Sequence, residues 1–126
     1  MKLLLDTHVL LWWLEDNPAL SDIGRALIAN RENTVFVSAV SLWEISLKQS
    51  LGKLRLTENF DEVLAAQPFE NLPLTAAHTR EVVNLPWHHR DPFDRVLVAQ
   101  ARVSGLRLLT ADERIRAYGE SILYAR

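Results

Sequence analysis

The segment that most constrains the fold is the apolar run 96–103, which begins directly after Asp91-Pro92-Phe93-Asp94-Arg95. Proline suits the first turn of a helix, because its φ is already fixed and it has no N–H to satisfy. Asp91 stands where it can cap such a helix, and Gly105 stands where it can end it. Little polar surface remains between these two ends, so the sequence predicts a helix that is buried on nearly every side.

A buried helix that starts with two carboxylates needs an explanation for both. Capping accounts for both on spacing alone, because Asp94 lies three residues after Asp91, where the acid of a capping box sits. A metal site is the alternative explanation for Asp94. The rest of the chain is needed to choose between them.

Short apolar or β-branched segments alternate with helical patterns along the whole chain. The expected strands are residues 3–5, 34–37, 69–74 (the weakest), 106–110 and 122–124. The expected helices follow caps at Thr7, Ser21 or Asp22, Ser38 or Ser41, Thr57, Thr75 and Asp91, with a last short helix at 111–118. Such alternation predicts right-handed βαβ units and a parallel sheet covered on both faces. We therefore expect an α/β fold: one domain over residues 1–126, in three α/β/α layers around a mainly parallel sheet of four to five strands.

Composition excludes several classes of protein. The 126 residues include no cysteine, which rules out disulfides and thiolate–metal sites. A formal net charge of −2 argues against a general nucleic-acid binder held by a basic surface, although a bound cation attracts phosphate by itself. The apolar run after Met1-Lys2 is too short for a signal peptide or a membrane span, so we expect a cytoplasmic protein without a membrane partner.

Acidic residues follow the predicted strands. Ligands bind beyond the carboxyl ends of the strands in sheets of this kind. Asp6 stands at that end of the first strand, and Thr110-Ala111-Asp112 stands at that end of a later one. The helix that begins at Asp91 leads into this later strand. The sequence therefore directs acids from separate parts of the chain toward one crevice.

Glu44 is the fourth acid. Positions 40, 44, 47 and 51 share one helix face, which places Glu44 among Val40, Leu47 and Leu51. Burying its charge is costly unless it meets a cation or several hydrogen-bond donors. The alternative is a surface ion pair with Lys48, four residues on, which requires Glu44 to lean outward.

Four converging carboxylates predict a metal centre. Asp6, Glu44, Asp94 and Asp112 would repel one another, and their pKa values would rise, unless a divalent cation lay between them. Oxygen ligands suit Mg²⁺ or Mn²⁺ better than zinc. An ion held in this way, with positions open for water and phosphate, provides what metal-assisted phosphodiester hydrolysis requires.

Four stretches of the sequence together resemble the PIN-domain nucleases, and most closely the VapC-type toxins of bacterial toxin–antitoxin pairs. They are Asp6-Thr7, Ser41-Leu42-Trp43-Glu44-Ile45, Asp91-Pro92-Phe93-Asp94-Arg95 and Thr110-Ala111-Asp112. The resemblance covers essentially the whole chain and carries the family's acidic quartet onto Asp6, Glu44, Asp94 and Asp112. It implies a Mg²⁺-dependent endoribonuclease that cuts RNA, a small protein antitoxin and a homodimer. One departure is His8, where many relatives have a small polar residue, so the resemblance does not carry over a role for this position in holding metal-bound water.

Supporting residues have competing interpretations. The candidates are Thr7, Asp91, Arg95 and Thr110. Asp91 is better explained as the helix cap than as an acid behind the metal ligands. Arg95 is equally suited to a substrate phosphate and to an ion pair with Asp91, and Thr110 to a bond with a metal ligand and to a helix cap. Zinc at the adjacent His88 and His89 is disfavoured by their spacing, and a contact with RNA or loop packing is the better interpretation.

Two further functions compete with a toxin. One keeps the fold but makes the chain an RNA-processing nuclease with no antitoxin. The other is a phosphoacceptor receiver domain, which needs adjacent acids after its first strand and a late lysine. The chain has Asp6-Thr7 and no lysine after Lys53, so the receiver interpretation is the weaker one. A dinucleotide-binding module lacks its Gly-rich turn.

Overall fold

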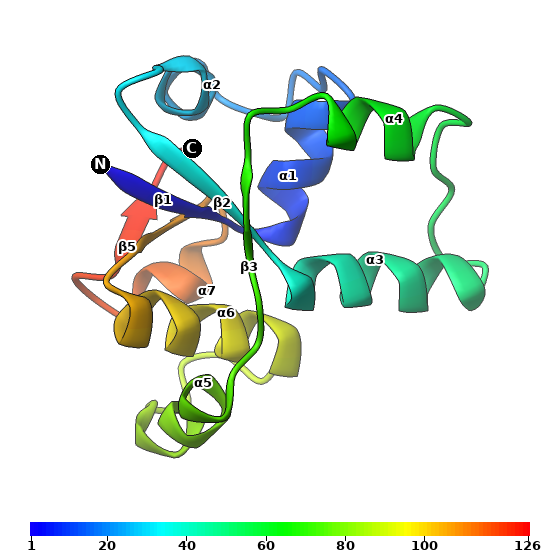
Figure 1. Ribbon diagram of the computed structural model, residues 1–126. Helices are drawn as coiled ribbons and strands as arrows, with labels where there is room; N and C mark the ends of the chain where they lie inside the picture. Colours follow the sequence, from blue (N-terminus) through cyan, green and yellow to red (C-terminus); the bar gives the residue numbers. More distant parts are fainter.

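The fold is described by a computed structural model that covers residues 1–126 (Figure 1). The strands are β1 (Lys2–Leu5), β2 (Thr34–Ser38), β3 (Glu70–Leu72), β4 (Arg107–Thr110) and β5 (Ile122–Tyr124). The α-helices are α1 (Thr7–Leu14), α2 (Asp22–Ala29), α3 (Ala39–Ser50), α4 (Phe60–Ala65), α5 (Ala76–Glu81), α6 (Pro92–Ser104) and α7 (Glu113–Arg116). A short 3₁₀ helix, η1 (Val82–Asn84), follows α5.

The five strands form one parallel sheet in the order β3-β2-β1-β4-β5. The chain first builds the sheet outward from β1 to β3 and then continues on the other side of β1 with β4. The carboxyl ends of β1 and β4 are neighbours, with Leu5 in register with Leu109. The strand order reverses at this place, which is where α/β sheets bind ligands. The predicted parallel α/β sheet is confirmed, at the upper limit of the expected strand number.

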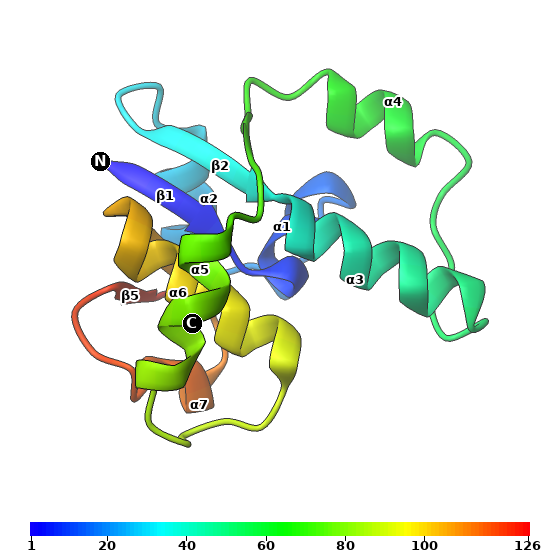
Figure 2. The same ribbon diagram turned by 60° about the horizontal axis from the view of Figure 1, so that its bottom comes forward.

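Successive residues of β1 point into two separate cores, one on each face of the sheet. Leu3 and Leu5 belong to the core that includes Leu10 of α1 and Ile28 of α2. Leu4 belongs to the core that includes the central residues of α6 and Ile115 of α7. Figures 1 and 2 show the corresponding helices on opposite faces of the sheet. Alternation along a central strand thus produces the three layers that the sequence predicted.

Helix α6 confirms the ends predicted for it. The Asp91 carboxylate accepts hydrogen bonds from the N–H groups of Phe93 (2.8 Å) and Asp94 (3.3 Å), and the helix ends at Gly105 in the left-handed conformation (φ 68°). Its centre is buried, but Val103 in the last turn is exposed. Burial on every side therefore holds for the centre of the helix only.

Several helices begin at a residue other than the predicted cap. Asp6 occupies the cap position of α1, so the prediction for Thr7 was wrong; its hydroxyl donates to Ser41 Oγ (3.0 Å). Ser38, rather than Ser41, caps α3, because Ser41 is buried inside the helix. Helix α4 begins after Asn59 instead of Thr57. None of the helices has the length and hydropathy that a bilayer crossing requires.

Helix α3 leaves the sheet after its first turns. Figure 2 shows its far end and α4 reaching away from the strands on one side of the molecule. Val40 and Glu44 near the start are buried, whereas Leu47 and Leu51 are 38% and 58% exposed. The apolar face predicted for this helix therefore packs into the core in its first half and is exposed on the surface in its second half.

Candidate metal centre

Asp6 stands at the end of β1, in the cap position of α1, but its carboxylate does not cap the helix. Oδ2 instead accepts a hydrogen bond from Thr110 Oγ1 (2.7 Å), and the buried Oδ1 has no hydrogen-bond partner. Thr110 Oγ1 in turn accepts from the N–H of Asp112 (3.0 Å). Thr110 thus makes the hydrogen bond to an acid that was suggested for it, but the suggested helix cap was wrong, because Asp112 occupies the cap position of α7.

Glu44 is buried in the first half of α3, where only 2% of the residue is exposed. Oε2 accepts a hydrogen bond from Lys48 Nζ (2.6 Å), which raises the pKa of Lys48, while Oε1 has no partner. The ion pair considered as an alternative to a metal site is present. The expectation that Glu44 must lean outward to form it was wrong, because the long side chain of Lys48 reaches inward instead.

Asp94 lies in the first turn of α6 and is surrounded by other acids. Burial raises the pKa of Asp94 to about 8, and the charges of Asp6, Asp91 and Glu44 add to the effect. Burial also raises the pKa of Asp6, against the hydrogen bond from Thr110. The carboxylates are therefore close enough to oppose one another's ionisation, as the sequence predicted for a site without a cation.

Asp112 forms the outer side of the cluster. It caps α7 by accepting from the N–H of Arg114 (2.9 Å), and both its oxygens receive hydrogen bonds from the Arg114 side chain. Burial acts to raise the pKa of Asp112, but these hydrogen bonds hold it below its ordinary value. Arg114 is itself exposed, so its side chain can leave when another cation approaches.

This cluster also includes a histidine, His89, which the sequence analysis did not assign to it. His89 is buried, and its Nε2 lies 2.8 Å from Asp94 Oδ2 and 3.6 Å from Asp112 Oδ2. The adjacent His-His pair was the only signal in the sequence, and it does not say which ring turns inward. His88 packs edge-on against Tyr118, with ring centroids 5.0 Å apart.

Arg95 has neither of the roles predicted for it. Its guanidinium is buried and donates to the carbonyl of Pro86 (2.8 Å) and the hydroxyl of Tyr118 (3.0 Å), with no bond to Asp91. The same hydroxyl accepts from the N–H of His89 (3.1 Å). Arg95 therefore fixes the loop that carries His89 and does not face the acids as a free cation.

The unpartnered polar atoms show whether these residues fit a cation. Four buried side-chain nitrogen or oxygen atoms lack a hydrogen-bond partner, and three of them belong to this cluster: Asp6 Oδ1, Glu44 Oε1 and His89 Nε2. Leaving buried carboxylate oxygens without a partner is costly. A divalent cation would satisfy them and favour ionised carboxylates, so the donor set fits an oxygen-coordinated ion.

The sequence of the chain matches one protein family. The sequence model described as "PIN domain" matches residues 3–121 of the chain. Among curated proteins, the chain is similar to Ribonuclease VapC22 of Mycobacterium tuberculosis, with 29% identity over 118 residues that span 91% of this chain and 90% of that protein.

Solved structures share the fold at lower identity. VapBC2 from Rickettsia felis, crystallised on a DNA fragment from its promoter, aligns over 100% of both chains with a TM-score of 0.75 and 15% identity. FitAcB from Neisseria gonorrhoeae aligns over 96% of both chains (TM-score 0.66, 19% identity). VapBC-5 from Mycobacterium tuberculosis, described as a member of a toxin–antitoxin family, covers 99% of this chain and 98% of its own (TM-score 0.61, 21% identity).

Proposed function

The chain belongs to the PIN-domain family, and on that basis we propose that it is a divalent-metal-dependent endoribonuclease, the toxin of a VapC-type toxin–antitoxin pair. The observation that carries the proposal is the pair of buried, unpartnered carboxylate oxygens on Asp6 and Glu44. These atoms lie in a cluster whose acids suppress one another's ionisation. Membership of this family also removes the receiver-domain interpretation.

In the proposed site, Asp6, Glu44, Asp94 and Asp112 hold Mg²⁺ or Mn²⁺. When bound, such an ion lowers the pKa of a water molecule and offsets the charge that develops on the phosphate of the RNA. Thr110 keeps Asp6 in place through its 2.7 Å hydrogen bond. Lys48 offsets the charge of Glu44 from the other side. Asp91 fixes the start of α6 and hence the position of Asp94.

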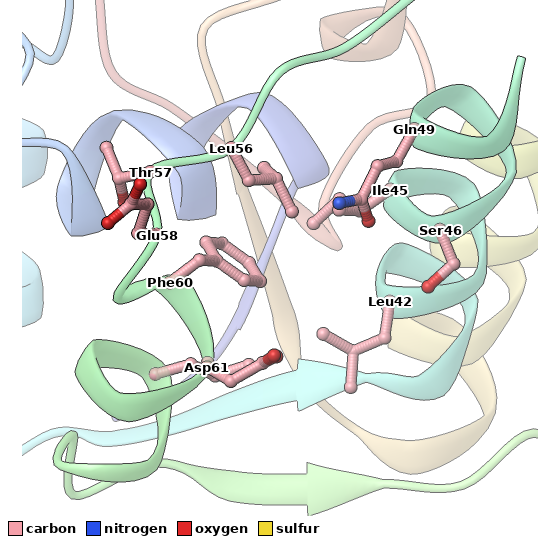
Figure 3. Close-up of a pocket in the computed structure, with 10 residues that line it drawn as sticks. Leu42, Ile45, Ser46, Gln49, Leu56, Thr57, Glu58, Phe60 and Asp61 are labelled. Atoms are coloured by element: carbon pink, nitrogen blue, oxygen red, sulfur yellow. The ribbon is translucent and has the colours of Figure 1, made fainter. Parts of the chain in front are cut away.

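A pocket between α3 and α4 supports a protein partner. Figure 3 shows Leu42 and Ile45 of α3 facing Phe60 of α4 across this pocket of about 450 Å³. Glu58 and Asp61 lie on its lining as well. An apolar floor with acidic residues suits a basic, amphipathic segment, and we assign this role to the small antitoxin. Among the structural relatives, one from Klebsiella pneumoniae is described as a toxin–antitoxin complex, and VapBC-5 as a member of a family of toxin–antitoxin systems.

A second exposed surface supports the proposed homodimer. Trp43 and Leu47 of α3 and Leu51, which caps the C-terminus of this helix, recur at four-residue intervals and are exposed. Phe93 of α6 packs against Trp43 with ring centroids 4.8 Å apart, which extends the apolar surface. We assign this surface to a contact with a second copy of the chain. We propose that the resulting homodimer is cytoplasmic. Sedimentation equilibrium of the wild type and of Leu51→Asp tests the assignment: a dimer that Leu51→Asp dissociates supports it, and a wild-type monomer contradicts it.

RNA cleavage by the purified protein tests the enzyme. With Mg²⁺ or Mn²⁺ we expect cleavage of single-stranded RNA, no cleavage with chelator, and a loss of at least about 100-fold in Asp6→Asn and Asp94→Asn. Asp61→Asn, which neutralises an acid on α4 outside the cluster, is the matched control and should cleave normally. Circular dichroism confirms that each variant folds. Undiminished cleavage in the Asp6 and Asp94 variants would reject the chemistry.

The antitoxin needs a separate test, because an RNA-processing PIN nuclease would pass the cleavage assay. A short reading frame beside this one, encoding a small basic protein, is expected in the genome. Its co-expression should suppress cleavage and yield a co-purified complex, and Phe60→Asp should weaken that complex. A catalytically active chain with no such neighbour and no inhibitor favours the RNA-processing alternative.

A further inference from the structure

His89 is held rigidly beside the acid cluster. Its main-chain N–H donates to the Tyr118 hydroxyl (3.1 Å), which also accepts from the buried guanidinium of Arg95. Only 7% of the residue is exposed. The ring therefore has little freedom, and the groups around it define what it can do.

The distances alone allow two roles. Suitable ligand atoms of His89, Asp94 and Asp112 all lie within 4.8 Å of one another, which is compatible with a shared metal ion. The same short distances are expected if the ring donates a hydrogen bond to the carboxylates. The two roles require different tautomers: a ligating Nε2 uses its lone pair and leaves the proton on Nδ1, whereas a donating Nε2 carries the proton.

A main-chain N–H group beside the His89 ring distinguishes the two roles. The N–H of Asp91 points at His89 Nδ1 (N···N 3.4 Å), so Nδ1 is an acceptor and the proton of the neutral ring lies on Nε2. If Nε2 ligated a metal, Nδ1 would carry a proton that faces the Asp91 proton. Metal-ligating histidines normally present this second N–H to an acceptor, and the ring of His89 has a donor there instead.

We infer that His89 is a positioning residue, a neutral Nε2–H donor shared between Asp94 and Asp112, and not a metal ligand. Nε2 lies between the two carboxylates, 2.8 Å from Asp94 Oδ2 and 3.6 Å from Asp112 Oδ2, and is aligned on neither oxygen. We expect a donor in this place to link the acid of α6 to the acid after β4 when their carboxylates are ionised. The inference rests on the proposed function only for the kind of ion that these acids hold.

Nuclear magnetic resonance of the ¹⁵N-labelled rings tests the tautomer without any ion. Two-bond ¹H–¹⁵N correlations report which ring nitrogen carries the proton. His78 is an internal reference, since its Nδ1 also accepts a main-chain N–H, from Thr75 (3.1 Å). His88→Gln and His89→Gln assign the signals. We expect the Nε2–H form for both His78 and His89; an Nδ1–H form of His89 would overturn the inference.

Manganese alone, without RNA, tests the positioning role. Echo-detected electron paramagnetic resonance should show no nitrogen coupling from a coordinated imidazole. Calorimetric titration should show Mn²⁺ affinity about 10-fold weaker in His89→Ala, with much of the loss restored in His89→Gln, which keeps an N–H donor. His88→Ala is the control and should bind as the wild type does.

Two results would contradict the inference: a nitrogen coupling that disappears in His89→Ala, or wild-type affinity in that variant. Neither depends on catalysis. Failure to cleave RNA, with the tautomer and the affinities as expected, would reject the proposed enzyme and leave the role of His89 intact.

Discussion

Helix α6 carries two buried polar clusters that differ in one respect. In its middle, Gln100 accepts a hydrogen bond from Ser38 Oγ (2.5 Å) and donates to the carbonyl of Pro73 (3.4 Å). His78 beside it receives the N–H of Thr75 on Nδ1 and meets Ser104 Oγ (2.9 Å) through Nε2. All these groups are neutral in the fold, because burial lowers the pKa of His78, and none is left without a partner.

At its start, the same helix contributes Asp94 to a cluster of acids that is also largely buried but incomplete. Asp6, Glu44 and His89 each have one polar atom without a hydrogen-bond partner, and the pKa of Asp94 is raised to about 8. His89 makes the difference clearest, since its Nδ1 is partnered as in His78 while its Nε2 has no aligned acceptor. A cluster complete in itself stabilises the fold, whereas one that needs a further charge is a site for binding it.

Removing Gln100 should have the largest effect on stability. Gln100→Ala leaves Ser38 and the Pro73 carbonyl without their partner and opens a cavity, so we expect a loss of roughly 4 kcal/mol in the free energy of unfolding. Urea denaturation measures it, with and without Mg²⁺. If the cluster around Gln100 is complete without an ion, the loss in stability is the same with and without Mg²⁺; a loss that Mg²⁺ reverses would connect this cluster to the proposed metal centre.

Neutralising Asp94 should act in the opposite direction. Its pKa is 3.8 in the unfolded chain and about 8 in the fold, so the unfolded state loses its proton first. The stability of the metal-free protein therefore falls as the pH rises from about 4 to about 8. Asp94→Asn removes this fall and should be more stable than the wild type by a few kcal/mol at alkaline pH, with little difference at pH 4.

Thermal or urea unfolding across this pH range, in chelator, is the measurement for Asp94→Asn. Saturating Mg²⁺ should stabilise the wild type at alkaline pH and stabilise the variant much less. Parallel pH profiles for the two proteins would show that Asp94 does not titrate as described, and the acid cluster would then be no more strained than the network around Gln100.

Replacing Lys48 should have the smallest effect. Its side chain is 39% exposed and makes the one ion pair of Glu44, and ion pairs of partly exposed side chains contribute little. Lys48→Met should destabilise the metal-free protein by less than about 1 kcal/mol, with no difference at saturating Mg²⁺, where the bound ion offsets the charge of Glu44. Chemical denaturation with and without Mg²⁺ measures this difference in the free energy of unfolding. A large loss of stability that Mg²⁺ leaves unchanged would make the Lys48–Glu44 pair a structural element of the kind seen around Gln100.

Local signals predicted much of the fold and of the acid cluster. The cap and proline before α6, the strand ends at Asp6 and Thr110 and the charge of Glu44 among apolar neighbours can each be identified within a few residues of sequence. They predicted the parallel sheet and the convergence of the carboxylates, because the topology of α/β sheets does the rest.

Contacts between distant side chains could not be predicted in this way. The hydrogen bond between Ser38 and Gln100 joins residues 62 apart in sequence, and nothing near either one signals the other. Arg95 was assigned by a rule for helix surfaces, and its side chain is buried. The position of the His89 side chain depends on how its loop folds back. Tyr118 and Arg95 hold this loop, and both lie outside it in the sequence.

The bond between Thr110 and Asp6 spans 104 residues, and this separation has a consequence for the newly made protein. A ribosome releases β1, β2 and β3 long before β4, so the early half of the sheet can assemble while Asp6 still lacks Thr110, Asp94 and Asp112. The nascent polypeptide therefore passes through most of its translation without a complete centre. The proposed nuclease site can therefore form only after β4 has left the ribosome, late in the synthesis of the chain.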